Sequence, residues 1–208
     1  MLILVSSFNQ PLYFYLYFFD WKSYTFDRVQ SEQMKGCFIM TNQDATYWIK
    51  QLELEAHPEG GYYKRMFESK ELFETTDKRI RHHYSSIYFL LNQASPSHFH
   101  RLKSDEIWYY HTGSPLSVHL LHPDGHYEKI KLGLDLANGE VLQAVVPKNV
   151  IFGSSIEGNG DFAVVSCMVS PGFDFKDFEL FTQDELLLDY PDHQEIIEKL
   201  AYEVLPLD

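Results

Sequence analysis

Short runs of aromatic and β-branched residues, separated by turn-forming residues, fill the chain from Tyr62 to about Phe181. Apolar runs of this length with alternating polar positions are typical of β-strands, and no helical pattern separates them. Many short strands without intervening helices predict an antiparallel sandwich or barrel. We expect strands at 62–68, 85–91, 97–101, 106–110, 116–122, 127–132, 142–146, 150–154, 162–169 and 178–181.

Turn signals between these runs support the same interpretation. His122-Pro123-Asp124-Gly125-His126 predicts a β-hairpin with Asp-Gly at its tip, because this dipeptide tolerates the positive φ angles of a tight hairpin turn. Residues 157–160 and Asn138-Gly139 predict two further turns. The two histidines of the strand at 116–122, His119 and His122, are expected to face solvent.

An amphipathic helix is expected before the strands, over Thr41–Ala56. Thr41, with Asp44 three residues later, fits a capping box at its start. The segment His57–Gly61 ends the helix, because proline cannot continue it and glycine frees the backbone. Four apolar residues of this segment fall at helical spacing: Ala45, Trp48, Ile49 and Leu52.

The tail of the chain returns to helical patterns. Thr182 can cap a helix over Gln183–Leu188, with Glu185 completing a capping box. Asp192 can cap a second helix over Gln194–Tyr202. An apolar stripe on the second helix is expected to pack on the barrel.

The first 40 residues differ from the rest. The stretch Leu2–Phe19 is uncharged, but Asn9-Gln10-Pro11 interrupts it, and no basic residue precedes it as in a signal peptide. Three interpretations stay open: a leader or miscalled start before Met34 or Met40, an extra packing arm, or a membrane anchor or export signal. We therefore expect an N-terminal extension at 1–40 and one domain with helical flanks at 41–208.

Charge and cysteine usage narrow the class of protein. The 208 residues include 17 basic and 30 acidic ones, and the net charge of −13 argues against nucleic-acid binding. The basic group at 78–83 is interpreted as a solvated loop rather than an anion-binding loop. The two cysteines, Cys37 and Cys167, form no CxxC pair, which favours a reducing, cytoplasmic compartment. Cys167 lies in an apolar run and is expected in the core.

The richest chemistry lies in the segment SHFHRLKSDEIWYYHTG at 97–113. In a regular strand His98 and His100 share one face, and Glu106 lies on the next strand. If these faces point inward, two imidazoles and a carboxylate converge in the barrel. That set suits Fe, Mn, Ni or Zn, and it matches the ligand set of non-haem iron oxygenases.

A metal-free pocket is the alternative use of the same residues. His100 would then exchange a proton with substrate, Glu106 would orient it, and Tyr110 would be a candidate acid. Such a set suits proton abstraction beside a carbonyl group. Residues placed to contact the substrate are Glu59, His98, Arg101 and Trp108, the last by stacking on a ring. Arg101 has a second interpretation, a surface pair with Asp105.

The spacing of His98, His100, Glu106 and Gly113 resembles the first motif of the cupins. A second motif is weaker, because Phe152 stands where the fourth metal ligand would be. The resemblance sharpens to the small cupin family numbered five, a family without an established reaction, which does not require a histidine at position 98. Four segments carry it: HPEGGY at 57–62, HRLKSDEIW at 100–108, PGFDF at 171–175 and ELLLDYP at 185–191.

This resemblance implies a jelly-roll β-barrel with flanking helices, commonly a homodimer, and similar in fold to deoxysugar-nucleotide 3,5-epimerases. The expected function is an enzyme that moves a proton on a small polar substrate such as a sugar or nucleotide-sugar. Two alternatives stay open, a metal-dependent cupin oxygenase and a non-catalytic small-ligand binding protein. The cofactor is accordingly a divalent metal or none, and neither a nucleic acid nor a membrane is an expected partner.

Overall fold

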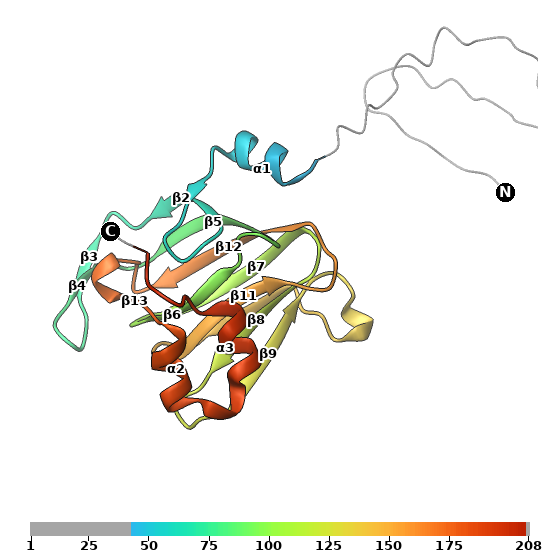
Figure 1. Ribbon diagram of the computed structural model, residues 1–208. Coiled ribbons are helices and arrows are strands. Elements are labelled where there is room, and N and C mark those ends of the chain that lie inside the picture. Colours follow the sequence, from blue (N-terminus) through green and yellow to red (C-terminus); the bar gives the residue numbers. More distant parts are fainter. Residues whose placement is uncertain (1–42, 207–208) are drawn as a thin grey trace, which may run out of the picture. The chain divides into compact units, whose positions relative to one another are not determined.

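Two antiparallel β-sheets face each other in a jelly-roll barrel (Figure 1). The computed structural model describes residues 43–206. One sheet has six strands in the order β1-β2-β5-β12-β7-β10, and the other has five in the order β13-β6-β11-β8-β9. A separate two-stranded hairpin, β3-β4, projects beside the first sheet. The predicted antiparallel barrel with helical flanks is confirmed.

The strands are β1 (Glu55–Ala56), β2 (Tyr62–Glu68), β3 (Leu72–Glu74), β4 (Ile80–His82), β5 (Ser85–Asn92), β6 (Ser97–Leu102), β7 (Asp105–Gly113), β8 (Leu116–Leu121), β9 (Tyr127–Leu132), β10 (Gln143–Val146), β11 (Ile151–Ile156), β12 (Phe162–Ser170) and β13 (Phe178–Leu180). The helices are α1 (Ala45–Leu52), α2 (Gln183–Asp189) and α3 (Gln194–Leu200), with short 3-10 turns η1 (Leu136–Asn138), η2 (Phe175–Asp177) and η3 (Pro191–His193). All ten predicted strands are present, whereas β1, β3 and β4 were not predicted.

The space between the two sheets holds the main core. Alternate residues of each strand point into it, among them Phe89 on β5, Trp108 on β7 and Phe152 on β11. Burying large aromatic side chains from both sheets supplies most of the hydrophobic stabilisation of such a fold. This packing fills one part of the barrel and leaves room for a cavity in the other.

Two further cores lie on the outer faces of the sheets. Helices α2 and α3 cover the five-stranded sheet, where Ile197 and Leu200 of α3 pack against Phe99 and Ile151. Helix α1 lies on the outer face of the six-stranded sheet and packs on Leu90. The predicted packing of the C-terminal apolar stripe on the barrel is therefore confirmed (Figure 1).

Two predicted helices are longer than the observed ones. Helix α1 begins at Ala45 with Asp44 as its N-cap, and the predicted capping residue Thr41 lies outside the described residues. The helix ends at Leu52, because residues 55–56 pair with β2 instead. Helix α3 ends at Leu200, and its start has no side-chain cap from Asp192. The capping box of Thr182 and Glu185 at the start of α2 is confirmed.

The interpretations of residues 1–40 lie outside the described residues. Within 43–206, no helix combines the length and the apolar character that a membrane span requires.

Candidate active site

A cavity of about 390 Å³ opens between the sheets, beyond the aromatic core. Its size is in the range of pockets that bind small molecules. Strand β6 contributes His100 and strand β7 contributes Glu106, and both side chains are almost fully buried. The remaining lining residues are Glu55, His57, Glu59, Tyr63, Arg65, Ser85, Ile87, Phe89, Leu102, Cys167, Val169, Phe173 and Phe175.

The tight turn His57–Gly61 delivers Glu59 to this cavity. The backbone N–H of Gly60 donates to the His57 carbonyl at 2.9 Å, and Gly60 has a φ of +103° that favours glycine. A Cβ at Gly60 would also lie 2.0 Å from the Pro96 carbonyl oxygen, so no larger residue fits. Glu59 is therefore buried. A less deeply placed residue of the turn, in contact with substrate, was expected from the sequence.

Glu59 and His100 form the central polar pair of the cavity. The Oε2 atom of Glu59 lies 3.3 Å from Nε2 of His100, and its Oε1 accepts a hydrogen bond from the Ser97 hydroxyl at 2.9 Å. The other ring nitrogen of His100, Nδ1, lies 2.7 Å from the carbonyl oxygen of His98. A carbonyl oxygen only accepts, so Nδ1 carries the proton and Nε2 is left as an acceptor.

The same pair is held in its neutral form by burial. Burial lowers the pKa of His100 to about 3, so its imidazole is uncharged at neutral pH. Burial, together with the charge of Glu106, raises the pKa of Glu59 well above its usual value. The carboxyl of Glu59 therefore keeps its proton and can donate it toward Nε2 of His100.

Glu106 is the second carboxyl of the cavity, and its environment differs. Burial raises the pKa of Glu106 to about 7, while a hydrogen bond from the Cys167 thiol partly opposes that rise. Burial and the charge of Glu106 raise the pKa of Cys167 as well, so its thiol stays a neutral donor. Two carboxyls whose environments separate their pKa values are the usual basis for paired acid and base roles.

Aromatic rings enclose the cavity around His57. The ring of Phe175 stacks on His57 with centroids 6.1 Å apart, and Tyr63 meets it edge-on at 4.7 Å. Burial lowers the pKa of His57 to about 4, so this ring too is uncharged at neutral pH. Such a wall offers ring faces for stacking and no fixed charge.

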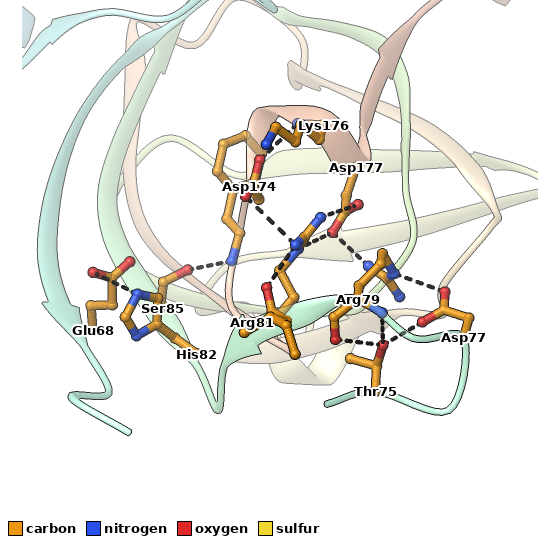
Figure 2. Close-up of polar contacts among 12 residues, drawn as sticks. Glu68, Thr75, Asp77, Arg79, Arg81, His82, Ser85, Asp174, Lys176 and Asp177 are labelled. Carbon is orange, nitrogen blue, oxygen red and sulfur yellow. Dashed lines mark hydrogen bonds and ion pairs between the residues drawn. The ribbon is translucent and has the colours of Figure 1, made fainter. Parts of the chain in front are cut away.

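The segment carrying Phe175 is tied to the β3-β4 hairpin by an arginine cluster (Figure 2). Arg81 binds Asp177 side-on, with Nε–Oδ2 at 2.7 Å and Nη2–Oδ1 at 2.9 Å. Arg79 donates to the same carboxylate, and together the two guanidinium groups lower the pKa of Asp177 against the effect of its burial. The basic group at 78–83 was predicted to be a solvated loop; that is wrong for these two arginines, which anchor the wall of the cavity.

Arg81→Lys is expected to lower the free energy of unfolding by about 1–2 kcal/mol, because an ammonium replaces a two-point contact by one charged hydrogen bond. Urea denaturation of wild type and variant measures this difference. Arg65→Lys is the matched control, since Arg65 forms a one-point ion pair with Glu68 through Nη1, and its partly exposed guanidinium otherwise lies over the Phe173 ring. Equal losses in the two variants would contradict the anchoring role.

His98 does not share the cavity with His100, contrary to the expectation from alternation. Strand β6 carries one extra residue opposite Gly153 of β11, and this bulge moves His98 off the face of His100. Gly153 permits it, because a Cβ there would lie 2.8 Å from the Ser97 carbonyl oxygen. The backbone N–H of His98 and its Nδ1 both lie 2.7 Å from the Glu59 carbonyl oxygen. His98 thus holds the main chain of Glu59, and its ring stacks on Tyr202.

Three other predicted site residues lie away from the cavity lining: Trp108, Tyr110 and Arg101. Trp108 does share the inner face with Glu106, but it is fully buried between Phe89 and Phe152. The hydroxyl of Tyr110 donates to the Gly113 carbonyl oxygen at 2.6 Å, so it serves the strand end.

Arg101 points out of the barrel. It pairs with Glu179 at 2.6 Å rather than with Asp105, and its guanidinium lies over the ring of Phe181. His119, expected in solvent, is buried and hydrogen-bonded to Tyr127 and Ser155.

The predicted metal set of His98, His100 and Glu106 does not assemble. Among residues 43–206, these three are not a group whose ligand atoms lie within 4.8 Å of one another. Phe152, in the place of the fourth ligand, packs on His100 with ring centroids 4.1 Å apart. The donor set of the cavity therefore does not fit the metal that the cupin motif implies.

Two features of the candidate site were not predicted from the sequence. His57 was assigned to the turn and to the segment HPEGGY without a role in the site, although its spacing of two residues from Glu59 was a usable signal. Cys167 was predicted in the core, which is confirmed, but its contact with Glu106 depends on the pairing of β12 with β7. No local pattern reports such a pairing.

The facing antiparallel sheets, with a polar cavity between them, define a cupin. Residues 46–181 match the family described as Cupin superfamily (DUF985), and the chain belongs to this Cupin_5 family.

Relatives of the chain have been found in a yeast, a protozoan and a bacterium. The chain is 35% identical over 153 residues to the uncharacterized protein YML079W of Saccharomyces cerevisiae, covering 66% of this chain and 76% of the yeast protein. It is similar to the solved structure of a hypothetical protein from Leishmania major, with 43% identity, a TM-score of 0.74, and coverage of 77% and 99%. The structure of protein SO0799 from Shewanella oneidensis gives 48% identity, a TM-score of 0.73, and coverage of 78% and 99%.

Proposed function

We propose that the protein is an enzyme that moves a proton on a small, uncharged, polar substrate, in the manner of a sugar epimerase or isomerase. The observation that carries the proposal is the pair of buried carboxyls in one cavity, with Glu59 backed by His100 at 3.3 Å and Glu106 having a pKa of about 7. Paired groups of different proton affinity are what proton transfer beside a carbonyl requires.

In the proposed reaction Glu106, as carboxylate, removes a proton from the carbon next to the substrate carbonyl. The Glu59 carboxyl donates its proton to the carbonyl oxygen, which gives a neutral enediol. Glu106 then returns the carbon proton while the Glu59 carboxylate takes back a hydroxyl proton of the enediol, so both carboxyls end in their starting forms. Protonation of the neighbouring carbon gives the isomer, and protonation of the same carbon on its other face, after the enediol has turned over in the cavity, gives the epimer. Before substrate binds, the Nε2 atom of His100 accepts the hydrogen bond of the Glu59 carboxyl, and the substrate carbonyl oxygen then replaces it as the acceptor of that proton. No oxidant or reductant is consumed.

The charges of the lining favour an uncharged reacting group. Arg65 is the one cation among the lining residues, and its Nη1 is paired with Glu68. Both histidines of the lining are neutral at pH 7 by virtue of their lowered pKa values. A phosphate would therefore meet several carboxyls and a single cation that is already paired with Glu68, whereas the rings of Tyr63 and Phe175 can stack on a sugar face.

The test is a thermal-shift screen of neutral aldoses, ketoses and related polyols, followed by incubation of each binder in D₂O. Binding to the folded state raises the melting temperature by mass action. Deuterium at the carbon beside the carbonyl, detected by NMR or mass spectrometry, is the expected result. If members of the panel bind but none of them exchanges hydrogen with the solvent, the protein is a non-catalytic binding protein instead.

We further propose a cytoplasmic homodimer, supported by the cysteine usage and by the family resemblance. Strand β10 lies at the edge of the six-stranded sheet, and exposed aliphatic side chains gather on it and on the preceding loop: Leu134, Leu136, Val141, Leu142 and Val145. Light scattering is expected to give twice the mass of the chain, and Val145→Glu is expected to shift it toward the monomer. Wild-type protein that stays monomeric at micromolar concentration would refute the dimer.

A further inference from the structure

The hairpin between β8 and β9 carries a cluster of polar side chains that the proposed reaction does not use. The backbone N–H of His122 donates to the His126 carbonyl at 3.0 Å, and that of Gly125 donates to the His122 carbonyl at 2.9 Å. The turn predicted from the sequence is therefore closed by main-chain bonds. Strands β8 and β9 contribute no residue to the cavity lining, so this cluster is separate from the candidate active site.

Three side chains of this hairpin bring ligand atoms together. The rings of His122 and His126 stack with centroids 3.9 Å apart and an angle of 9° between their planes. The Nε2 atom of His122 lies 2.9 Å from Oε2 of Glu128. Within residues 43–206, these three form the one group of histidine, cysteine or acidic residues whose ligand atoms all lie within 4.8 Å of one another.

Asp124 gives the cluster a hydrogen bond to a ligand side chain, as metal sites commonly have. Its Oδ1 atom lies 2.6 Å from Nδ1 of His126 and accepts the backbone N–H of the same residue at 3.2 Å. A carboxylate bonded to one ring nitrogen fixes the imidazole and leaves Nε2 free to bind a metal. The carboxylates of Asp124 and Glu128 would also balance much of the charge of a divalent cation.

We propose that His122, His126 and Glu128 bind a divalent transition metal, with Asp124 as the residue that orients His126. Two imidazoles and one carboxylate are borderline ligands that suit Zn²⁺, Ni²⁺ or Cu²⁺ better than Mg²⁺ or Ca²⁺. The side chains of His126 and Glu128 are about half exposed. Solvent or a donor from another molecule would therefore complete the coordination.

Bound metal would also brace the C-terminal region. The ring Nε2 of His193, in η3, lies 3.0 Å from the Gly125 carbonyl oxygen, and the ring of His193 lies 5.6 Å from that of Tyr127. The hairpin is thus attached to the segment that leads into α3. Metal binding to the folded hairpin should therefore raise the melting temperature of the protein.

Isothermal titration of metal-free, full-length protein without an affinity tag, using ZnCl₂ as the probe, tests the site. One equivalent of Zn²⁺ is expected to bind and to raise the melting temperature, and both effects are expected to be lost in His126→Gln. Asp124→Asn should weaken binding by about 10–100-fold, because the loss of a carboxylate that hydrogen-bonds to a metal ligand commonly costs this much affinity. His83→Gln is the matched control, because His83 is a half-exposed histidine outside the cluster.

Substitution of Zn²⁺ by Co²⁺ gives a second readout, since visible absorption reports the geometry of the bound ion. The affinity is expected to rise from Co²⁺ to Ni²⁺ to Cu²⁺, and Zn²⁺ is expected to bind more weakly than Cu²⁺. Absence of stoichiometric binding would overturn the proposal. So would binding that His122→Gln, His126→Gln and Glu128→Gln leave unchanged while circular dichroism shows all three variants folded.

Discussion

Glu106→Gln is expected to slow the exchange of substrate hydrogen with solvent deuterium by about 10²–10⁴-fold, the usual contribution of a positioned general base. The amide keeps the shape of the carboxyl and can still accept the Cys167 thiol hydrogen bond, but it cannot take a proton. The binding of the sugar should change much less than the rate. Exchange is measured by NMR on the substrate that the thermal-shift screen identifies.

Glu59→Gln should lower the same rate by a similar factor, because the amide cannot transfer a proton to the carbonyl oxygen. His100→Gln should have a smaller effect if its part is to hold the Glu59 proton. His111→Gln is the control, since this exposed histidine of β7 bonds only Ser166 and lies outside the cavity lining. Wild-type exchange rates in both Glu106→Gln and Glu59→Gln would exclude the proposed pair of carboxyls.

The pH profile separates the two roles. The rate at low substrate concentration should rise with pH as Glu106 ionises, around its pKa of about 7, and should fall at higher pH when Glu59 loses its proton. In Glu106→Gln the rising limb should be absent from the residual activity. A merely structural role for Glu106 would leave that limb in place.

The fold could be predicted from the chain because its main signals are local. Strand β2 and strand β9 were placed at their observed bounds by alternation and flanking turns. Helix α1 shows where local signals end: the capping pattern at Thr41 is plausible, but residues 55–56 leave the helical path to pair with β2. Tertiary pairing outweighs helix propensity at such a boundary.

The candidate site could be predicted only in part, because its geometry depends on contacts between distant strands. His100 and Glu106 followed from alternation on β6 and β7, and both line the cavity. The same rule failed for His98, because the bulge opposite Gly153 changes the register by one residue. For Arg101, the partner is Glu179 of β13, nearly 80 positions further along the chain. Neither a bulge nor a distant ion-pair partner has a local signature in one sequence.

The pKa of Glu106 also predicts a large effect on stability. A carboxyl whose pKa is raised from 4.5 to about 7 on folding stabilises the fold fully below pH 4.5 and loses that contribution as pH rises through 7. The loss amounts to about 3 kcal/mol, since one pKa unit corresponds to about 1.4 kcal/mol. The glutamine of the Glu106→Gln variant does not ionise. The free energy of unfolding of this variant, relative to that of wild type, should therefore grow by that amount between pH 4.5 and pH 8.

Only the difference between variant and wild type isolates this effect. The pKa values of His57, His100 and His119 are lowered by burial, and a lowered histidine pKa makes stability fall as pH drops below about 6.5. In the wild-type curve this trend opposes that of Glu106 over the same pH range. Subtracting the curves cancels the histidines, which are common to both proteins, and leaves the contribution of Glu106 together with its effect on the pKa of Glu59.

The measurement is the melting temperature of wild type and Glu106→Gln at intervals from pH 4.5 to pH 8. For a chain of this size, the expected divergence is roughly 6–12 °C at the upper end. Glu53→Gln is the control, because Lys64 lowers the pKa of the exposed Glu53 and moves its titration below this range. Parallel curves for Glu106→Gln and wild type would mean that Glu106 is already ionised in the folded state at pH 5. The assignment of Glu106 as a base poised near neutrality, and with it the proposed proton transfer, would then lose its physical basis.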